Sequence, residues 1–416
     1  MSVCIEELGK RARAAAARLA LLSDKDKNLV LEAAADELIR HKYEILAANG
    51  LDVAAARAKG MKESLVDRLT LSTARIEGIA EGVRQVAALP NPVGEVVTDT
   101  VRPNGLHIRE VRVPLGVVGM IYEARPNVTA DTFALCFKTG NAVILRGGSD
   151  ALQSNKAIVA ALHAALKACG RPEDAVLLVE DTSREGAAQM MRLRGLIDVL
   201  IPRGGAGLIR SVVENSTVPV IETGSGNCHI YVDESADPDM AVRIIHNAKT
   251  QRTGVCNACE SLVIHRNIAD RAIPAIGADL LAAGVRIHGD EETCRLLPQA
   301  EPATDEDWYT EYLDLEISIK VVDDLDQAIE HINRCSTQHS EAIITRDPAA
   351  AARFRAENDS ACVYVNASTR FTDGFEFGFG AEIGISTQKL QARGPMGLRA
   401  LTTSRYLIDG DGQIRG

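Results

Sequence analysis

The sequence predicts an α/β protein in which a parallel, doubly wound sheet is followed by a second α/β unit. Over residues 117–223, apolar runs of strand length alternate with helix-length segments, and buried strands with helical crossovers are typical of a parallel sheet. The same alternation resumes from residue 230, with no internal repeat and no low-complexity linker. The chain also has 416 residues, which is too long for one core and favours two or three domains.

The chain is predicted to begin with helices. Residues 5–22 are rich in Ala and Leu, and Ser23 begins a second helix with a capping-box-like sequence. Further helices are expected over residues 47–58 and 72–88, and the prolines at 90 and 92 end this region. The apolar stripe of the second helix is predicted to comprise Leu29, Leu31, Ala34, Leu38 and Ile39.

A β-hairpin is predicted next, from β-prone runs at residues 95–102 and 106–113 joined across Pro103-Asn-Gly105. The hairpin is rich in charge and can project from the body of the protein. It is either an ordinary sheet edge or an oligomerisation arm, since an exposed edge needs a partner or protection. A late strand at 404–408 can complete its sheet.

The doubly wound sheet is expected to contain strands at residues 117–121, 142–146, 175–179, 199–201 and 218–222, with helices at 151–168, 183–193 and 208–215. Glycines follow three of the strands, in Arg146-Gly147-Gly-Ser149, Arg203-Gly204-Gly205 and Thr223-Gly-Ser-Gly226. Such glycines either let the backbone approach a phosphate or form tight turns. The G-x-G-x-x-G dinucleotide fingerprint is absent.

The second α/β unit is predicted to have strands at 229–232, 261–265, 285–287, 316–322, 341–344 and 362–366, with helices at 237–248, 268–283 and 325–334. Between one of these helices and the next strand lies the loop KTQRTGVCNACE, residues 249–260. Cys256 follows Gly254 there, and a thiol so placed is a candidate nucleophile if its pKa is lowered. Lys249 and Arg252 would help if they face it.

The same loop allows other interpretations. Cys256 can be a half-buried structural cysteine. With Cys259 it forms a C-x-x-C, which suits a zinc site or a dithiol redox pair, although a zinc site would need a second pair of ligands that the sequence lacks. Spacing alone does not decide which of the two sulfurs matters.

Composition and charge exclude several classes of function. A net charge of −11, with Lys and Arg scattered rather than in a run, argues against a nucleic-acid surface. The nine cysteines are not tightly paired, which suits a reducing compartment. The first residues, MSVCIEE, lack the features of a signal peptide, and no apolar run approaches the ~20 residues of a membrane span. We therefore expect a soluble cytoplasmic protein with no nucleic-acid or membrane partner.

Five segments together resemble the aldehyde dehydrogenase superfamily, and the resemblance covers essentially the whole chain. The segments are YEARPNVTAD at 122–131, ETGSGNCH at 222–229, QRTGVCN at 251–257, NASTRFTDG at 366–374 and GAEIGISTQ at 380–388. The resemblance implies an aldehyde-dehydrogenase-like fold: a Rossmann-type cofactor domain (1–94 and 114–229), a second α/β catalytic domain (230–370) and a small β oligomerisation arm (95–113 and 400–416). Residues 371–399 would return to the cofactor domain.

The resemblance also implies catalytic roles. Cys256, rather than Cys259, matches the catalytic cysteine of the family. Asn127 matches the amide that stabilises an oxyanion, together with the backbone N–H of the nucleophile. Glu222 falls where hydrolytic members keep a general base. Glu311 falls near the residue that orients the nicotinamide ribose, within a Tyr-Leu-Asp-Leu sequence that departs from the usual pattern.

NADPH is the cofactor that the resemblance implies. Arg146 and Ser149 occupy a strand end where members that prefer NAD often have Lys and Glu; a Glu there would repel the 2′-phosphate of NADPH, whereas Arg and Ser accept it. The cofactor-binding residues are predicted to be Arg146, Gly147, Ser149, Arg203, Gly204, Gly205 and Glu311, with no metal site.

The activity implied is the acyl-phosphate-reducing one of the superfamily: NADPH-dependent reduction of L-glutamyl 5-phosphate to L-glutamate 5-semialdehyde and phosphate through a cysteine thioester, in proline biosynthesis. Arg125 and Arg370 are candidates for the carboxylate or phosphate of the substrate, because a guanidinium matches both; otherwise each forms a surface ion pair. The alternatives are a hydrolytic or CoA-acylating aldehyde dehydrogenase, or a catalytically inactive binding subunit. A homodimer or homotetramer is expected, with contact to glutamate 5-kinase for substrate transfer.

Overall fold

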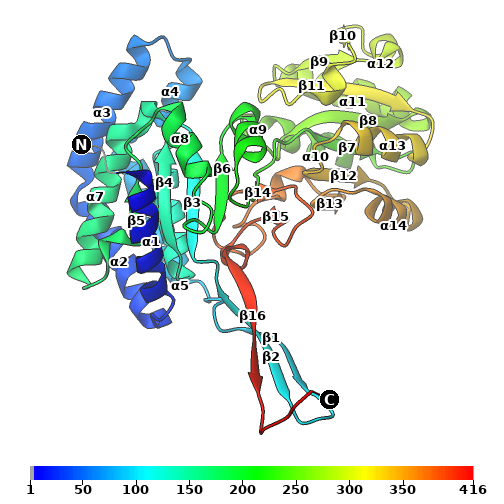
Figure 1. The fold of residues 1–416 in the computed structure, drawn as a ribbon. Coiled ribbons are helices and arrows are strands. Elements are labelled where there is room, and N and C mark those ends of the chain that lie inside the picture. Colours follow the sequence, from blue (N-terminus) through cyan, green and yellow to red (C-terminus); the bar gives the residue numbers. More distant parts are fainter. Residues whose placement is uncertain (1–3, 416) are drawn as a thin grey trace. The chain divides into compact units, whose positions relative to one another are not determined.

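The computed structural model describes residues 4–415; residues 1–3, on which part of the prediction about a signal peptide rests, and residue 416, the last of the predicted arm, lie outside the described residues. The chain divides into two compact units (Figure 1). Unit 1 contains the described residues up to Thr223, Gly378–Gly384 and those from Met396 onward, and unit 2 contains Gly224–Phe377 and Ile385–Pro395. The assignment of cofactor and catalytic domains to residue ranges stays a prediction.

Unit 1 begins with helices, as predicted. They are α1 (Ile5–Leu19), α2 (Asp24–Arg40), α3 (Lys42–Ala58), α4 (Glu63–Leu69) and α5 (Thr73–Ala88). Ser23 caps α2 by accepting a hydrogen bond from the backbone N–H of Asp26 at 3.1 Å. The predicted stripe of α2 is wrong at Leu29, which is 61% exposed; the buried face runs through Val30 instead. Several stripes fit an Ala- and Leu-rich helix, and packing against α5 and α7 selects one.

The sheet of unit 1 has the strand order β5-β4-β3-β6, and all its pairs are parallel. The strands are β3 (Val117–Tyr122), β4 (Ala142–Gly147), β5 (Val176–Leu178) and β6 (Val199–Arg203). The connecting helices are α6 (Asn127–Lys138), α7 (Leu152–Ala168), α8 (Arg184–Met191) and α9 (Ala206–Asn215). The central strand β3 is buried at every position, which explains its continuous apolar sequence.

The predicted strand over residues 218–222 is wrong. This segment forms only an isolated bridge, between Val220 and Leu200. The N–H of Leu200 donates to the carbonyl of Pro219, and Ile221 donates back to the carbonyl of Leu200, but Pro219 has no N–H with which to extend the ladder.

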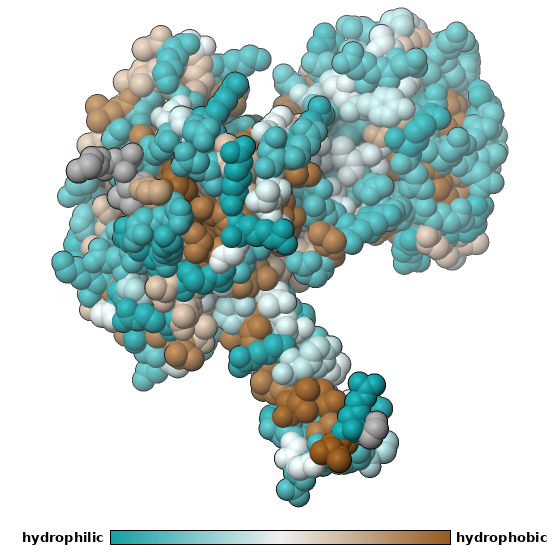
Figure 2. Space-filling view, in the orientation of Figure 1, coloured by the Kyte–Doolittle hydropathy of each residue, from teal (hydrophilic) through white to brown (hydrophobic). Residues whose placement is uncertain are grey.

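The predicted hairpin is confirmed as part of a three-stranded antiparallel sheet with the order β1-β2-β16. Its strands are β1 (Val96–Val101), β2 (His107–Pro114) and β16 (Thr402–Asp409). We call this sheet the arm. The edge strand β1 is exposed at every position, and apolar side chains are exposed over the arm (Figure 2), among them Val101 and Ile408.

Unit 2 contains a seven-stranded parallel sheet with the order β10-β9-β11-β8-β7-β12-β13. Its strands are β7 (Cys228–Val232), β8 (Cys259–His265), β9 (Arg286–Gly289), β10 (Glu301–Pro302), β11 (Glu316–Val322), β12 (Ser340–Ile344) and β13 (Cys362–Val365). Its helices are α10 (Pro238–Thr250), α11 (Arg266–Ala282), α12 (Glu291–Leu296), α13 (Leu325–Cys335) and α14 (Pro348–Glu357). A short pair, β14 (Ile385–Ser386) and β15 (Gly394–Pro395), lies outside this sheet. All six predicted strands of this unit are present, while β10, α12 and α14 add to what the sequence predicted.

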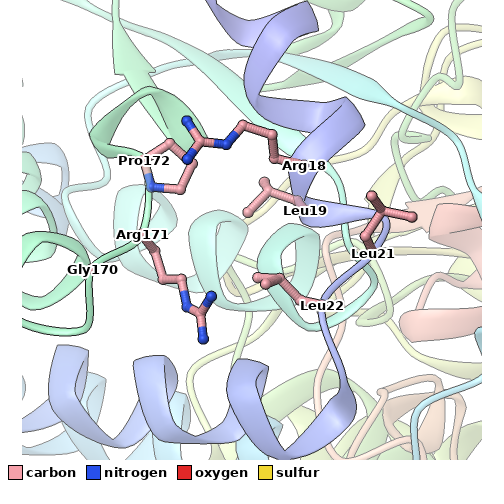
Figure 3. A pocket seen from close by; sticks show the side chains of 7 residues that line it. All are labelled: Arg18, Leu19, Leu21, Leu22, Gly170, Arg171 and Pro172. Carbon is pink, nitrogen blue, oxygen red and sulfur yellow. The ribbon is translucent and has the colours of Figure 1, made fainter.

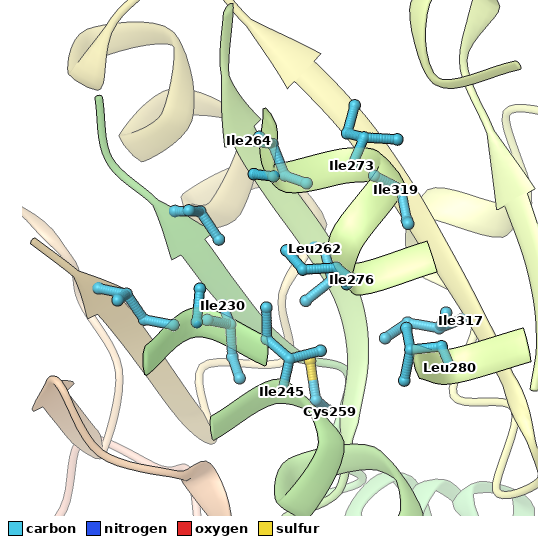
Figure 4. Close-up of a cluster of buried hydrophobic side chains, with 14 of the residues drawn as sticks. Ile230, Ile245, Cys259, Leu262, Ile264, Ile273, Ile276, Leu280, Ile317 and Ile319 are labelled. Atoms are coloured by element: carbon cyan, nitrogen blue, oxygen red, sulfur yellow. The ribbon is translucent and has the colours of Figure 1, made fainter. Parts of the chain in front are cut away.

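An apolar core joins the sheet of unit 2 to α10 and α11. Figure 4 shows part of it, with Ile245 of α10 and Ile276 of α11 beside Leu262 of β8. Over residues 4–415, no helix is long and apolar enough to cross a membrane, and no group of three or more His, Cys, Asp or Glu side chains is arranged to hold a metal ion.

Candidate active site

The loop that carries Cys256 lies between α10 and β8 in unit 2, and Cys256 itself is half-buried. Gly226 packs backbone to backbone against it, because the β-carbon of any other residue at 226 would overlap the carbonyl oxygen of Cys256. The thiol of Cys228 donates to that same oxygen, with 3.1 Å between Sγ and O. The backbone of Cys256 is therefore fixed from two sides.

Glu311 belongs to the same cluster of contacts. Its Oε1 accepts a hydrogen bond from the N–H of Gly226 at 2.7 Å. Burial raises the pKa of the Glu311 carboxyl, and the Gly226 N–H and the charge of His339 partly oppose that shift. Glu311 is thus connected to the backbone of Cys256 through Gly226, which contacts both. Its predicted contact with a ribose stays a prediction.

Arg370 braces the other side of the loop. Its guanidinium donates through Nη1 to the side chain of Asn257 and through Nε to Gln251 Oε1 at 2.8 Å. Asn257 in turn donates to the carbonyl of Thr372 at 2.9 Å. Burial and the neighbouring charge of Arg252 lower the pKa of Arg370. A substrate-binding role for Arg370 stays a prediction, and the guanidinium already has partners in the loop.

Cys259 differs from Cys256 in its surroundings. It is 0% exposed, it lies in the apolar core (Figure 4), and burial raises the pKa of its thiol. Its thiol donates to the backbone carbonyl of Ser261, with 3.4 Å between sulfur and oxygen. Cys259 is therefore a core residue, whereas the Cys256 side chain is partly accessible.

Lys249 does not serve the thiol in the way the sequence suggested. It is 0% exposed, and its Nζ forms an ion pair with Glu260 at 2.6 Å. A buried cation must be paired, and Glu260 on β8 is the partner that the fold supplies.

In unit 1, Asn127 is the first residue of α6 and its side chain is exposed. Its Nδ2 donates to Asp131 Oδ2 at 2.9 Å. The start of the helix is held from below by buried hydroxyl contacts: Tyr122 with Thr129 Oγ1 at 2.7 Å, and Thr129 with Asn155 Oδ1 at 2.9 Å. The Tyr and Thr of the YEARPNVTAD segment therefore have a structural role, which is to hold the start of α6 in place.

The carboxyl end of β4 carries the predicted cofactor residues of the first glycine segment. Arg146 is half-buried, and its Nη2 donates to the carbonyls of Thr182 and Ser183, the latter at 2.9 Å. Burial lowers the pKa of Arg146, and Asp181 acts in the opposite direction. Ser149 is exposed. A guanidinium fixed in place, with no carboxylate at position 149, is chemically compatible with the phosphate of NADPH, and the contact itself stays a prediction.

Packing alone explains why residue 147 is a glycine, since a β-carbon there would overlap the side-chain amide of Asn155. At the second glycine segment, Glu123 occupies the start of α9. Its Oε2 accepts a hydrogen bond from the N–H of Gly205 at 3.1 Å, and its side chain lies against Gly204. This contact of Glu123 was not predicted, because it joins residues far apart in the chain.

The remaining predicted residues are also in unit 1. Arg203 lies at the end of β6, against Gly384. Arg125 is half-buried in the turn before α6, and its carbonyl accepts from the N–H of Val128 at 3.1 Å. Glu222 is half-buried after the isolated bridge. The structure brings Cys256, Glu311 and Arg370 together in unit 2, and Asn127 and Arg203 near Asp131 in unit 1.

Two hollows of unit 1 lie away from these residues. One, of about 260 Å³, is bordered by the guanidinium groups of Arg18 and Arg171 at the end of α1 (Figure 3). The other, of about 650 Å³, lies between α1 and the arm. Neither contains a predicted site residue.

Comparison with known proteins agrees with these features. The model of the aldehyde dehydrogenase family matches residues 2–307. A gamma-glutamyl phosphate reductase of Heliobacterium modesticaldum is 60% identical over 98% of either chain. One of Carboxydothermus hydrogenoformans is 60% identical over 98% of this chain and 99% of its own length.

Solved structures agree with the fold. The crystal structure of the Thermotoga maritima gamma-glutamyl phosphate reductase has a TM-score of 0.97, with 52% identity over 99% of both chains. A propionaldehyde dehydrogenase of Rhodopseudomonas palustris with bound CoA has a TM-score of 0.70 at 16% identity over 98% of this chain and 97% of its own, and therefore shares the fold alone. The predicted aldehyde-dehydrogenase-like fold is confirmed.

Proposed function

The chain belongs to the aldehyde dehydrogenase family, within it to the gamma-glutamyl phosphate reductases, and on that premise we propose that it reduces L-glutamyl 5-phosphate to L-glutamate 5-semialdehyde with NADPH. This is the second step of proline biosynthesis. Members of this family are oxidoreductases that use a nicotinamide cofactor. The observation that carries the proposal is the half-buried Cys256 on a loop fixed by Gly226 and Cys228, beside a Cys259 that is buried in the core.

Cys256 is the proposed nucleophile. Its thiolate attacks the carbonyl carbon of the acyl phosphate, the carbon–oxygen bond to phosphate breaks, and phosphate leaves with the electron pair, which yields a thioester. After the thioester has been reduced, the carbon–sulfur bond breaks, the aldehyde leaves and Cys256 regains its negative charge. These two steps at Cys256 require neither a metal ion nor an oxidant.

Asn127 is the proposed oxyanion donor. Negative charge develops on the carbonyl oxygen in each tetrahedral species, and a fixed amide N–H stabilises that charge more than it stabilises the neutral carbonyl. The contacts beneath α6 hold the backbone of Asn127 in place, as such a role requires.

NADPH would be held by the strand ends of unit 1. Arg146 and Ser149 would bind the 2′-phosphate, and the backbone at Gly147, Arg203, Gly204 and Gly205 would approach the diphosphate. When bound, the cofactor supplies the hydride that reduces the thioester. Glu311, hydrogen-bonded to Gly226, would orient the nicotinamide ribose.

Further parts of the proposal concern the substrate, Glu222 and the assembly. Arg125 and Arg370 would bind the carboxylate or phosphate of the substrate. Glu222 would orient groups or relay protons rather than activate water. The exposed edge β1 of the arm supports a homo-oligomer, dimer or tetramer, in the cytoplasm. Contact with glutamate 5-kinase would serve substrate transfer.

The test is the reverse reaction, measured as reduction of NADP⁺ by glutamate 5-semialdehyde at varied inorganic phosphate, with the product identified by mass. Saturable dependence on phosphate and a labile acyl phosphate product are expected. Turnover to free glutamate without phosphate would establish a hydrolytic dehydrogenase, and turnover that requires CoA would establish an acylating one. No turnover and no NADPH binding would establish an inactive binding subunit.

A further inference from the structure

We propose that Asp131 is a positioning residue that holds the side-chain amide of Asn127 in the orientation that presents an N–H group to an oxyanion. This inference rests on the proposed function, in which Asn127 is the oxyanion donor. Asn127 and Asp131 are one helical turn apart on α6, and the Nδ2 of Asn127 donates to Oδ2 of Asp131 at 2.9 Å.

An asparagine needs such a partner because its amide has two opposite ends. A half-turn of the amide exchanges the N–H donors with the oxygen, and an oxygen directed at an oxyanion would repel it. An ionised carboxylate only accepts hydrogen bonds, so Asp131 selects the nitrogen end for its own side. That nitrogen carries two N–H groups, so one can bind Asp131 while the other binds the oxyanion.

The backbone at the start of α6 is already held in place, so rotation of the Asn127 amide is the main motion that Asp131 has to restrict. Thr129, between the two residues in sequence, is fully buried and hydrogen-bonded to Tyr122 and Asn155. The backbone beneath Asn127 is therefore fixed. Its exposed side chain is tied by the contact with Asp131.

Two groups face Asp131 and set its ionisation. Asn127 acts from α6 itself, and Arg203 acts from the end of β6; both lower the pKa of Asp131, but burial outweighs them and raises it to about 6. The other charged residue of α6, Lys138, pairs with Asp24 and donates to Asn28. Below about pH 6 Asp131 is neutral, and its hydroxyl can donate to the amide oxygen of Asn127. The selection of the nitrogen end is then lost.

The experiment is a double-mutant cycle on kcat with the full-length enzyme. Asp131→Asn offers both a donor and an acceptor, so it should lower kcat by about 10- to 100-fold, the range for a misplaced oxyanion donor. The KM for NADPH should stay within about twofold, because uniform binding is untouched. In the Asn127→Ala background the same substitution should cost less than about twofold, since the group it positions is gone.

The matched control is Glu81→Gln, which alters an exposed amide–carboxylate contact between residues four apart on α5, Gln85 Nε2 to Glu81 Oε1 at 3.4 Å. It should leave kcat unchanged. Losses from Asp131→Asn and Asn127→Ala that multiply would show that Asp131 acts elsewhere, and this inference would be overturned. An unchanged kcat in Asp131→Asn, with an active wild type, would overturn it too and leave the proposed function intact.

If the Asp131→Asn variant does not fold, the pH dependence of kcat tests the inference without it. Wild-type kcat should fall as the pH drops through about 6. That acid limb should be absent in Asn127→Ala; a limb of equal size and midpoint in Asn127→Ala would overturn the inference. A folded wild type without phosphate-dependent turnover would overturn the proposed function, and this inference with it.

Discussion

The thiol of Cys228 donates a hydrogen bond to the carbonyl oxygen of Cys256, and 3.1 Å separates the sulfur from the oxygen. Cys228 is fully buried at the start of β7, and burial raises the pKa of its thiol, which keeps the proton that makes the bond. The proposed nucleophile therefore has its main chain held by a second cysteine that stays protonated.

Cys228→Ala should lower kcat by about 3- to 10-fold, because one hydrogen bond to a partly buried carbonyl contributes about 0.5–1.5 kcal/mol. The control is Cys294→Ala, which removes a comparable thiol contact, to the carbonyl of Gly289 at 3.4 Å, on α12. Steady-state kinetics of both variants test the prediction. Equal activities in the two variants would show that the carbonyl of Cys256 does not need its donor.

Cys256→Ala should abolish turnover, with a loss on the order of 10⁴ or more, while NADPH binding survives. Cys259→Ala should keep most of its activity and lose stability, since it removes a fully buried sulfur from the core. Activity assays and cofactor fluorescence separate the two results. An active Cys256→Ala with a dead Cys259→Ala would reverse the assignment.

The sequence predicted most strands because their apolar runs are short and buried, as in β3 and β11. Spacing could not decide between Cys256 and Cys259, and only the family resemblance favoured Cys256. The packing of β8 adds that Cys259 lies in the core. Leu29 and the segment at 218–222 were mispredicted where neighbouring elements, not local pattern, set the outcome. The contact between Asn127 and Asp131 is different, because it could have been predicted from the sequence: the two residues are four positions apart at the start of a helix.

Arg146→Ala should raise the KM for NADPH by about 10- to 100-fold and change that for NADH far less. A charge-assisted contact with the 2′-phosphate contributes ~1.5–3 kcal/mol, and NADH lacks that phosphate. Lys156→Ala is the control, because it also removes a cation, one that lies on α7 and forms an exposed ion pair with Glu180. Equal damage to both cofactors would indicate that Arg146 serves the Thr182–Ser183 backbone and so the fold.

Glu123→Gln should lower the KM for NADPH by roughly threefold to tenfold. The carboxylate of Glu123 takes the N–H of Gly205, which is the donor that a phosphate at this helix start would use. Removing one negative charge near a phosphate is favourable by about 1 kcal/mol at an exposed site. Kinetics at low and at high salt provide the check, because screening should shrink the difference. A higher KM would mean that Glu123 shapes the loop for the cofactor.

Lys249→Met should destabilise unit 2, and by more at pH 8 than at pH 5.5. Lys249 and Glu260 are both fully buried and 2.6 Å apart, and removal of one partner from such a pair costs about 3–5 kcal/mol. Burial already raises the pKa of Glu260 to about 7, against the pull of Lys249. Without Lys249 the pKa rises further, so at pH 5.5 the carboxyl folds in its neutral form.

The sign follows from proton linkage. A carboxyl whose folded pKa lies above its unfolded value stabilises the fold below the unfolded pKa, and that stability is lost as the pH rises through the folded pKa. The deficit of Lys249→Met relative to wild type should therefore grow between pH 5.5 and 8 in urea unfolding. Lys156→Met, at an exposed pair, should cost about 0–1 kcal/mol with little dependence on pH. A deficit of equal size at both pH values would mean that Glu260 stays ionised without its partner, with solvent reaching β8.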